Sequence, residues 1–321
     1  MNLELPTCLL DWIDKDKLEW DWLSRNPNAI KLLKENPDKI NWRNLSSNPN
    51  AIDLLKENPD KIVWLMLSYN LNAEAIELFK ENSDKIHWDL LSLNLNAIEL
   101  LKENPNKIDW YYLSSNSNAI DLLKENHLEI NWSQLSLNIN AIDLLKENPY
   151  NIDWSYLSQN PNAIDLLKEN PDKIDWINLS LNPNAEAIAL LKENPDKISW
   201  YQLSYNPNAI ELLKENHDKI NWIYLSRNSN AIDLLKKNPD KINWSQLSLN
   251  PNAIDLLKEH PDKIVWTNLS KNPSIFTYDY EKMRENMLLF KEDLMKERFH
   301  PRNLRKFGSW GFNGGIDDDY E

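Results

Sequence analysis

The sequence is nearly devoid of glycine and cysteine. All four glycines lie at or beyond Gly308, so residues 1–307 contain none. This absence excludes the glycine-rich loops that bind phosphate groups in nucleotide-binding proteins. The single cysteine, Cys8, cannot build a disulfide framework or a thiolate metal site within one chain. We therefore expect a protein of a reducing compartment that has no metal site and no cofactor.

Long apolar runs and an excess of positive charge are also missing. No stretch approaches the roughly 20 apolar residues of a membrane span, and residues 1–10 lack the basic segment and apolar run of a secretory signal. A net charge of −14 disfavours binding to nucleic acid or to anionic membranes, because phosphate neutralisation needs a Lys/Arg-rich surface. We expect a soluble, cytoplasmic protein with no membrane partner.

What the chain does contain is a tryptophan every 22 residues, with two steps of 24. Self-similarity at a fixed period is typical of a stacked repeat array, or solenoid, in which each unit completes the core of its neighbours. The consensus unit is Asn-Pro-Asn-Ala-Ile-x-Leu-Leu-Lys-Glu-Asn-Pro-Asp-Lys-Ile-x-Trp-x-x-Leu-Ser-x. The twelve tryptophans are Trp20, Trp42, Trp64, Trp88, Trp110, Trp132, Trp154, Trp176, Trp200, Trp222, Trp244 and Trp266.

Each unit predicts two short helices. Asn26 is a favoured N-cap and Pro27 suits a first helical turn, so a first helix follows them. It should end at Asn36, because the following proline disfavours the α conformation there. We expect less sharply fixed ends where Ser83, His127 and His217 replace this proline. A second helix should begin at each tryptophan, capped by the preceding Asn, Asp or Ser and frayed where Val63, His87 or Val265 stands instead.

We therefore predict an all-α, helical-hairpin solenoid of about twelve repeats of 22 to 24 residues. A leucine-rich-repeat-like solenoid is the alternative, because it shares the period and an asparagine ladder. The three-residue spacing of Trp42 and Leu45 is helical, however, and favours the all-α form. Extra residues Ala73-Glu74 and Ala185-Glu186 account for the two longer steps and should lengthen the first helix of their units.

The pattern suggests four segments along an elongated, open arc roughly 100 Å long. Residues 1–19 are expected to cap its start, with Trp12 shielding the open end, and residues 20–273 form the solenoid. Residues 274–307 are predicted to be a C-terminal helical cap with an apolar stripe that includes Met283, Met287 and Leu288. Residues 308–321 are expected to be a flexible acidic tail.

The tryptophans are expected to be the large buried side chains of the core. On this interpretation, Trp154→Ala would cost about 3 to 5 kcal/mol of stability.

The repeat unit, over residues 20–273, resembles a family of asparagine-rich short-repeat proteins encoded by mimivirus-like giant DNA viruses. The run Ile275-Phe276-Thr277-Tyr278-Asp279-Tyr280 and the later His300-Pro301-Arg302-Asn303-Leu304 resemble the closing segment of the same family. The resemblance implies a viral protein of the host cytoplasm, with incorporation into the virion as an alternative. It implies no activity and supplies no catalytic residues.

No pattern in the chain predicts an enzyme. Four of the five histidines each replace another residue at a repeat position, so they are spread along the stack rather than gathered, and no serine has an accompanying base. We expect no catalytic residues.

Protein binding is the function that the repeat pattern favours, because variable positions are free to differ without cost to the core. The most variable positions are the two after each tryptophan and the one after each serine, and they are rich in Tyr and Leu. Tyrosine is common at interface hot spots; the alternative is that these side chains fill grooves between helices. The candidate protein-binding residues are Tyr69, Leu93, Tyr111, Tyr112, Leu137, Tyr156, Tyr201, Tyr205 and Tyr224.

Three functions remain open. The first is a non-enzymatic interaction scaffold for a host or viral protein whose identity the sequence does not give. The second is a structural or self-associating component of a virion or replication compartment. The third, which the net charge disfavours, is a nucleic-acid binder that uses the C-terminal basic cluster of Arg298, Arg302, Arg305 and Lys306.

Overall fold

The structure, a computed structural model, describes residues 6–285, 287–288 and 296. The chain divides into two compact units. The repeat body comprises Leu9–Phe276, and the end body comprises Met1–Cys8 with Thr277–Glu321.

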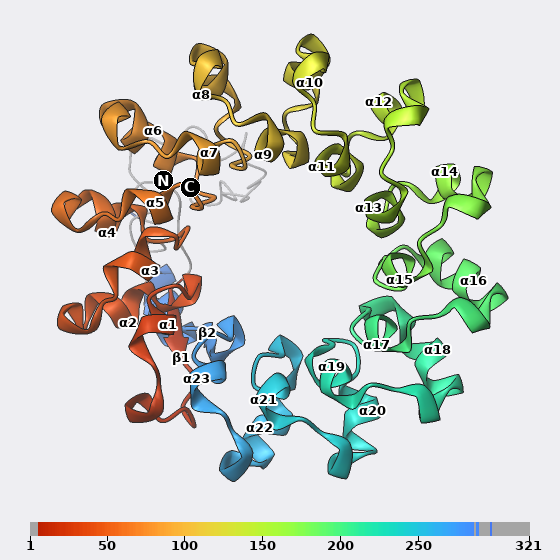
Figure 1. Ribbon diagram of the computed structural model, residues 1–321. Helices are drawn as coiled ribbons and strands as arrows, with labels where there is room; N and C mark the ends of the chain where they lie inside the picture. The colour runs from red at the N-terminus through yellow and green to blue at the C-terminus, as the bar shows by residue number, and fades with distance from the viewer. Residues whose placement is uncertain (1–5, 286, 289–295, 297–321) are drawn as a thin grey trace, which may run out of the picture. The chain divides into compact units, whose positions relative to one another are not determined.

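Two layers of short helices build the repeat body, one inside the other (Figure 1). Every inner helix begins at one of the twelve tryptophans, and every outer helix contains a Leu-Leu pair or its equivalent. The inner helices are α1 (Trp20–Leu23), α3 (Trp42–Ser46), α5 (Trp64–Leu67), α7 (Trp88–Leu91), α9 (Trp110–Ser115), α11 (Trp132–Leu137), α13 (Trp154–Gln159), α15 (Trp176–Leu179), α17 (Trp200–Leu203), α19 (Trp222–Arg227), α21 (Trp244–Leu247) and α23 (Trp266–Leu269). The outer helices are α2 (Ile30–Lys34), α4 (Ile52–Lys56), α6 (Glu74–Glu81), α8 (Ile98–Glu103), α10 (Ile120–Glu125), α12 (Ile142–Glu147), α14 (Ile164–Glu169), α16 (Ala185–Glu193), α18 (Ile210–Glu215), α20 (Ile232–Lys236) and α22 (Ile254–Glu259).

Turns of 3-10 helix join the two layers. Four of these turns begin at the proline of an Asn-Pro pair and precede an outer element. Others follow an outer helix, at the Pro-Asp-Lys segment or its equivalent. Their bounds are η1 (Lys15–Lys17), η2 (Pro27–Ala29), η3 (Pro37–Lys39), η4 (Pro59–Lys61), η5 (Ser83–Lys85), η6 (Pro105–Lys107), η7 (His127–Glu129), η8 (Pro149–Asn151), η9 (Pro171–Lys173), η10 (Pro195–Lys197), η11 (Pro207–Ala209), η12 (His217–Lys219), η13 (Pro239–Lys241), η14 (Pro251–Ala253), η15 (Pro261–Lys263) and η16 (Pro273–Ile275). Two strands, β1 (Thr7–Leu9) and β2 (Phe276–Tyr278), pair with each other. The all-α helical solenoid is therefore confirmed, without the strands that a leucine-rich repeat would place in every described unit.

Asparagine side chains set both ends of the outer helices. At the start, Asn26 Oδ1 accepts a hydrogen bond from the backbone N–H of Asn28 at 3.1 Å, as expected for an N-cap. At the end, Asn36 Nδ2 donates to the carbonyl of Leu32 at 2.9 Å. Asn126, which precedes a histidine instead of a proline, makes the equivalent bond to Leu122 at 2.8 Å. The expectation that the proline fixes this end was wrong, because the asparagine amide satisfies the last carbonyls in either case.

Most inner helices have the side-chain N-cap that the sequence predicts for them. Asn41 Oδ1 accepts from Asn44 N at 3.1 Å, whereas Val63, His87 and Val265 make no side-chain cap, and the helices that follow them have four residues each. Ser199 was predicted to cap and does not, and α17 also has four residues. The cap does not decide the length, however, because α15 and α21 are capped by Asp175 and Asn243 and have four residues each.

The fully buried core consists of leucine and alanine rather than tryptophan. In the unit around α13, Leu157, Ala163 and Leu167 are fully buried, while Trp154 is half-buried and packs against them. A lysine of the following unit covers part of the indole in several units; Lys39 Nζ lies 4.5 Å from the centre of the Trp20 ring. The expectation that the tryptophans are fully buried was therefore wrong. One face of each indole packs on the core, and the remainder of the ring is accessible to a lysine ammonium.

Two buried ladders of hydrogen bonds join the units: an asparagine ladder joins each unit to the next, and a serine ladder joins most of them. In the first ladder, Ser46 Oγ donates to the carbonyl of Trp42 at 2.7 Å and accepts from the backbone N–H of Val63 at 2.9 Å. In the second, Asn48 Nδ2 donates to the carbonyls of Ser24 and Asn26 at 3.1 and 2.9 Å. These serine and asparagine side chains are buried in every unit. Their bonds therefore fix the spacing between units from inside the core.

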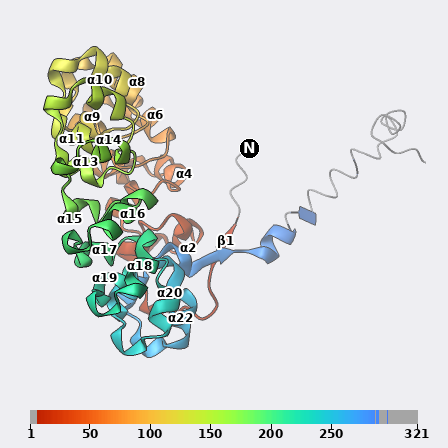
Figure 2. The same cartoon turned by 90° about the vertical axis from the view of Figure 1, so that its right-hand side faces the viewer.

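Both ladders continue from the last unit to the first, so the repeat body is a closed ring. The backbone N–H of Glu19 donates to Ser270 Oγ at 2.9 Å, and Asn26 Nδ2 donates to the carbonyl of Asn272 at 3.2 Å. Lys17 also covers Trp266, at 5.2 Å, as Lys39 covers Trp20. The predicted open arc was wrong: each unit turns the stack by one twelfth of a circle, so the donors of the first unit meet the acceptors of the last. Figure 2 shows this ring edge-on.

Segments from both ends of the repeat body make the twelfth unit. After α23, η16 begins an outer element as in other units, but β2 follows it in place of an outer helix and pairs with β1. The backbone N–H of Leu10 then donates to the carbonyl of Ile275 at 3.0 Å, and Trp12 packs half-buried on the core. The first unit therefore stacks on the last one, and Trp12 does not shield an open end.

The two-residue additions lengthen the outer helices that contain them, as predicted. α6 and α16 have eight and nine residues, and Asn72 and Asn184 cap the added glutamates. Each added glutamate, Glu74 or Glu186, forms an ion pair with a lysine of the preceding outer helix.

The predicted C-terminal cap is described only in part. Residues 280–285 and 287–288 are helical, and Met287 and Leu288 are 68% and 54% exposed. Met283, a third residue of the apolar stripe, is half-buried. The C-terminal cap stays a prediction. The remaining stripe, the basic cluster and the tail at 308–321 lie outside the described residues, so those predictions stand untested.

The asparagine ladder leads to a stability prediction. Asn160→Ala should cost about 3 kcal/mol, because it removes an N-cap and leaves the buried carbonyls of Ser136 and Asn138 without a donor. Asn162 is the matched control, since its exposed amide makes one bond to Ile139 O at 2.8 Å, and its alanine variant should cost about 1 kcal/mol or less. Urea unfolding measures both. Equal costs would contradict the importance of the buried ladder.

Ring closure is tested by a distance measurement. Spin labels at positions 25 and 271, in a Cys8→Ser background, should lie within about 25 Å, because neighbouring helices pack about 10 Å apart and the labels add their linkers. An open arc would place them much farther apart, up to its length of roughly 100 Å along the curved axis. Labels at positions 25 and 159 provide the comparison pair, which should give a clearly longer distance. A long distance for the first pair would rule out the closed ring.

Candidate protein-binding site

The three variable positions of each unit lie on one face of the inner helix. The first position after Trp and the position after Ser are four residues apart, and neighbours at this spacing share a helix face. The second position after Trp lies beside both. Leu and Ser at the third and fourth positions after Trp are fully buried or nearly so, which orients the variable face away from the outer layer and towards the middle of the ring (Figure 1). We call the combined surface the inner face.

The predicted binding residues occupy this inner face with two degrees of exposure. Five side chains are exposed: Tyr69, Tyr111, Tyr156, Tyr201 and Tyr205. Four are half-buried: Leu93, Tyr112, Leu137 and Tyr224. Both interpretations of the sequence therefore apply, since the exposed tyrosines are free to contact a partner and the half-buried residues also fill the space between neighbouring helices.

Side chains of adjacent units bond to one another along the inner face. Gln134 Nε2 donates to the hydroxyl of Tyr111 at 3.0 Å, Asn178 Nδ2 donates to Ser155 Oγ at 2.8 Å, and Asn268 Nδ2 donates to Ser245 Oγ at 2.9 Å. In each pair the second position after Trp reaches the first position of the preceding unit. These contacts restrict the rotamers of exposed polar groups, which lowers the entropy cost of binding.

An exposed apolar area of the inner face lies across α15, α17 and α19. The hydroxyls of Tyr201 and Tyr224 are hydrogen-bonded, and their ring centres are 4.2 Å apart. The hydrogen bond with Tyr224 raises the pKa of Tyr201. Ile177 and Ile223 flank it, 59% and 51% exposed. The sequence analysis missed these isoleucines, although they occupy the same repeat position as Tyr111 and Tyr201.

Charge is distributed very unevenly between the inner face and the rest of the ring. The eight consecutive inner helices from α9 to α23 have no charged residue at the two positions after Trp. At the position after Ser, no unit has an acidic residue. The whole inner face has four cations and two anions, a net charge of +2, against −14 for the chain. The cations are Arg25, Arg43, Arg227 and Lys271, and the anions are Asp21 and Asp89.

The ring is wide enough for a polypeptide segment to reach the inner face. Twelve inner helices spaced about 9 to 10 Å apart form a circle roughly 36 Å across, measured between helix axes. Subtracting the helix diameter of about 10 to 12 Å leaves an opening of roughly 25 Å. An α-helix or an extended chain fits within it.

Asp175 is the most strongly bonded acidic group next to the inner face. Partial burial raises its pKa, but hydrogen bonds from Ser155 Oγ, from the backbone N–H groups of Asn178 and Ile177 and from the Asn178 amide outweigh burial and lower the pKa overall. The bond from Ser155 is 2.7 Å long. The carboxylate therefore caps α15 and links it to α13.

Other kinds of site receive no support from the described residues. Within them there is no group of three or more His, Cys, Asp and Glu side chains that is able to hold a metal ion. Two histidines stack on tryptophans instead: His217 lies 5.1 Å from Trp222 and His260 lies 5.0 Å from Trp244, between ring centres. No helix in the described part of the chain has the length and apolar character to cross a membrane.

Comparison with known proteins adds no assignment. No protein-family model, curated protein or solved structure matches the chain.

The acid dependence of stability tests the role of Asp175. Asp175→Ala should cost about 1 kcal/mol at pH 7, the usual effect of losing an N-cap. Because the folded-state pKa is lowered, this contribution is complete above the unfolded-state pKa and disappears as the pH falls through the folded-state value. Denaturant unfolding at pH 7 and pH 3 measures the change. Asp165→Ala, an exposed residue of α14, is the control and should show a smaller cost; a cost for Asp175→Ala that persists undiminished at low pH would contradict the cap.

Proposed function

We propose that this protein is a ring-shaped scaffold that binds a polypeptide segment of a partner protein through its inner face. The observation that carries the proposal is that the two positions after Trp are uncharged in eight consecutive inner helices, from α9 to α23, of a strongly acidic chain. The residues at these positions are Tyr, Ser, Asn, Gln, Ile and Thr. A similar mixture of rigid aromatic side chains and adaptable small polar ones is found in antibody paratopes.

Two further features of this surface support the proposal. The exposed Ile177–Tyr201–Ile223 area provides apolar surface that a partner is able to bury, and tyrosine contributes strongly at interfaces. The side-chain bonds between units, such as that from Gln134 to Tyr111, hold part of the surface in place before binding. On the resemblance of the repeat, the partner is a host or viral protein in the cytoplasm of an infected cell.

A second candidate function is self-association in a structural assembly. The position after the ladder asparagine is usually proline, but Leu71, Leu95 and Ile139 occupy it in three units and are exposed. Apolar side chains repeated at one position favour a contact between two rings. Sedimentation at several concentrations distinguishes this function, because its mass increases with concentration without any partner.

Nucleic-acid binding is less favoured. The inner face has four cations spread over the ring, whereas non-specific binding depends on many phosphate contacts. The C-terminal basic cluster proposed from the sequence lies outside the described residues.

The proposal is tested with a triple variant, Tyr111→Ser, Tyr201→Ser and Tyr224→Ser. Wild type and variant are each used to capture proteins from infected cells, and the affinity of the purified partner is then measured by calorimetry. The variant should bind that partner with at least about 2 kcal/mol less free energy, because it loses hot-spot tyrosines. Helicity and melting should remain close to wild type.

Tyr150→Ser is the matched control, because Tyr150 lies fully exposed in η8, away from the inner face. It should bind the partner as wild type does. If the triple variant binds equally well, the partner does not use the inner face. If the triple variant melts far below wild type, these tyrosines belong to the core and the proposal fails.

A further inference from the structure

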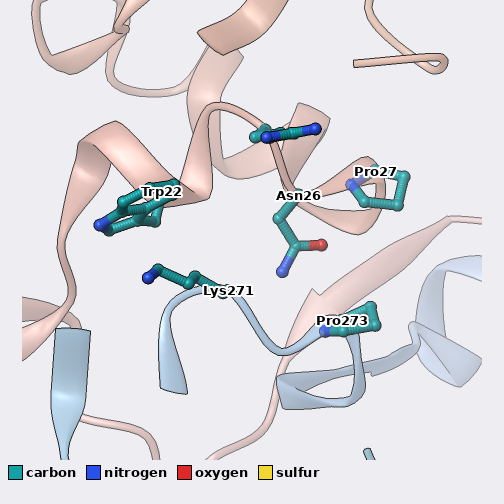
Figure 3. Close-up of a pocket in the computed structure, with 6 residues that line it drawn as sticks. Trp22, Asn26, Pro27, Lys271 and Pro273 are labelled. Carbon is teal, nitrogen blue, oxygen red and sulfur yellow. The ribbon is translucent and has the colours of Figure 1, made fainter. Parts of the chain in front are cut away.

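A shallow cavity lies where the first and last units of the ring meet. Its volume is about 370 Å³, and its walls are Trp22, Pro27 and Pro273 together with Arg25, Asn26 and Lys271. Figure 3 shows Trp22 and Asn26 on the early segment and Lys271 and Pro273 on the late one. We call it the seam pocket, since ring closure alone brings these residues together.

Two cations line this pocket, and the structure holds one of them in place. Lys271 Nζ lies 3.8 Å from the centre of the Trp22 ring, a close cation–π contact that fixes the ammonium while leaving its other side accessible. Arg25 is exposed beside it. The neighbouring carboxylate, Asp21, accepts a hydrogen bond from Asn41 Nδ2 at 2.8 Å, so it is bonded to the second unit rather than to either cation.

The pocket belongs to a longer cationic row. The position after Ser is Arg227 in the tenth unit, Leu249 in the eleventh, Lys271 in the twelfth and Arg25 in the first. Three of these four successive units around the ring therefore have a cation at this position. The Arg227 guanidinium lies 6.0 Å from the Tyr205 ring, so this cation too is placed over an aromatic side chain. No acidic residue occurs at this position in any unit. The row therefore stands out in a chain with 50 acidic residues and a net charge of −14.

We propose that the seam pocket and the cationic row bind an acidic stretch of the partner polypeptide, with a carboxylate between Arg25 and Lys271. This inference rests on the proposed function and specifies the chemistry of its partner. Carboxylates complement both cations, and the apolar walls of Trp22, Pro27 and Pro273 accommodate the methylene groups of a Glu side chain. The uncharged inner helices then contact the adjoining uncharged part of the same segment.

An acidic polypeptide fits this row better than a nucleic acid. Three cations on one short arc match the few carboxylates of a peptide, while the net charge of −14 of the whole chain repels a long, continuous phosphate backbone. Selectivity follows from the same arrangement, because cations gather on the inner face at this row.

The test uses two fluorescein-labelled decapeptides, one of glutamate and one of glutamine, and the full-length protein. Fluorescence anisotropy at 50 mM salt should show binding of the glutamate peptide at least tenfold tighter than that of the glutamine peptide. The double variant Arg25→Gln with Lys271→Gln should weaken glutamate-peptide binding at least tenfold. Raising the salt to 300 mM should weaken the wild-type interaction as well, because exposed charges are screened.

Arg43→Gln is the matched control, because it removes an inner-face cation outside the row, and it should change glutamate-peptide binding less than twofold. Equal wild-type affinity for both peptides, or unchanged affinity in the double variant, overturns the inference. The triple tyrosine variant should still bind the glutamate peptide, since that probe needs only the row. Loss of partner binding in the tyrosine variant therefore reports on the proposed function, and loss of glutamate preference in the arginine–lysine variant reports on the seam pocket.

Discussion

The buried asparagine ladder is the interaction on which the rest of this structure depends. A ladder side chain performs two tasks: its oxygen caps the segment that starts an outer element, and its amide donates to two carbonyls of the preceding unit. At the closure, the Asn26 amide donates to one carbonyl, that of Asn272. A buried amide without partners would cost several kcal/mol. The ladder therefore fixes the local conformation of each unit and the stacking of neighbouring units together. The serine ladder, in turn, secures the start of most inner helices.

The variable inner face follows from this division of roles. Core, caps and inter-unit bonds are supplied by fixed positions such as Leu157, Ser158 and Asn160, all of them buried. The positions after Trp and after Ser have no part in the ladders, so their chemistry is free to change from unit to unit. The result is a rigid frame with a surface that differs around its circumference: the positions after Trp are uncharged in eight inner helices, and cations gather at the position after Ser near the seam.

Much of the fold was predictable because it is local. The Asn-Pro pair at 26–27 predicts a capped helix start, and the three-residue spacing from Trp42 to Leu45 predicts a helix rather than a strand; both are confirmed. The proline stop was a wrong attribution, since the Asn36 amide makes the bond that ends the helix. The prediction of a tryptophan core was wrong, because size alone does not indicate burial when a lysine from the next unit covers one face of the indole.

Closure and its consequences were beyond sequence reasoning. Whether twelve units make an arc or a ring depends on a small rotation per unit, which no single residue encodes, and the error accumulates along the stack. The seam pocket was missed for the same reason, because Trp22 and Lys271 are distant in sequence. The position of the tyrosines was predictable from the repeat register. That Ile177 and Ile223 belong to the same exposed surface is known only from their exposure in the structure.

The split twelfth unit places a constraint on the number of repeats. An open solenoid tolerates the gain or loss of one unit, because its length is free. Here, adding a unit between α9 and α11, for example, would leave the bonds of Asn26 and Glu19 to the last unit out of register unless every unit changed its angle slightly. Repeat duplication, the usual route by which such arrays grow, is therefore penalised in this molecule. Its copy number is set by the geometry of a circle.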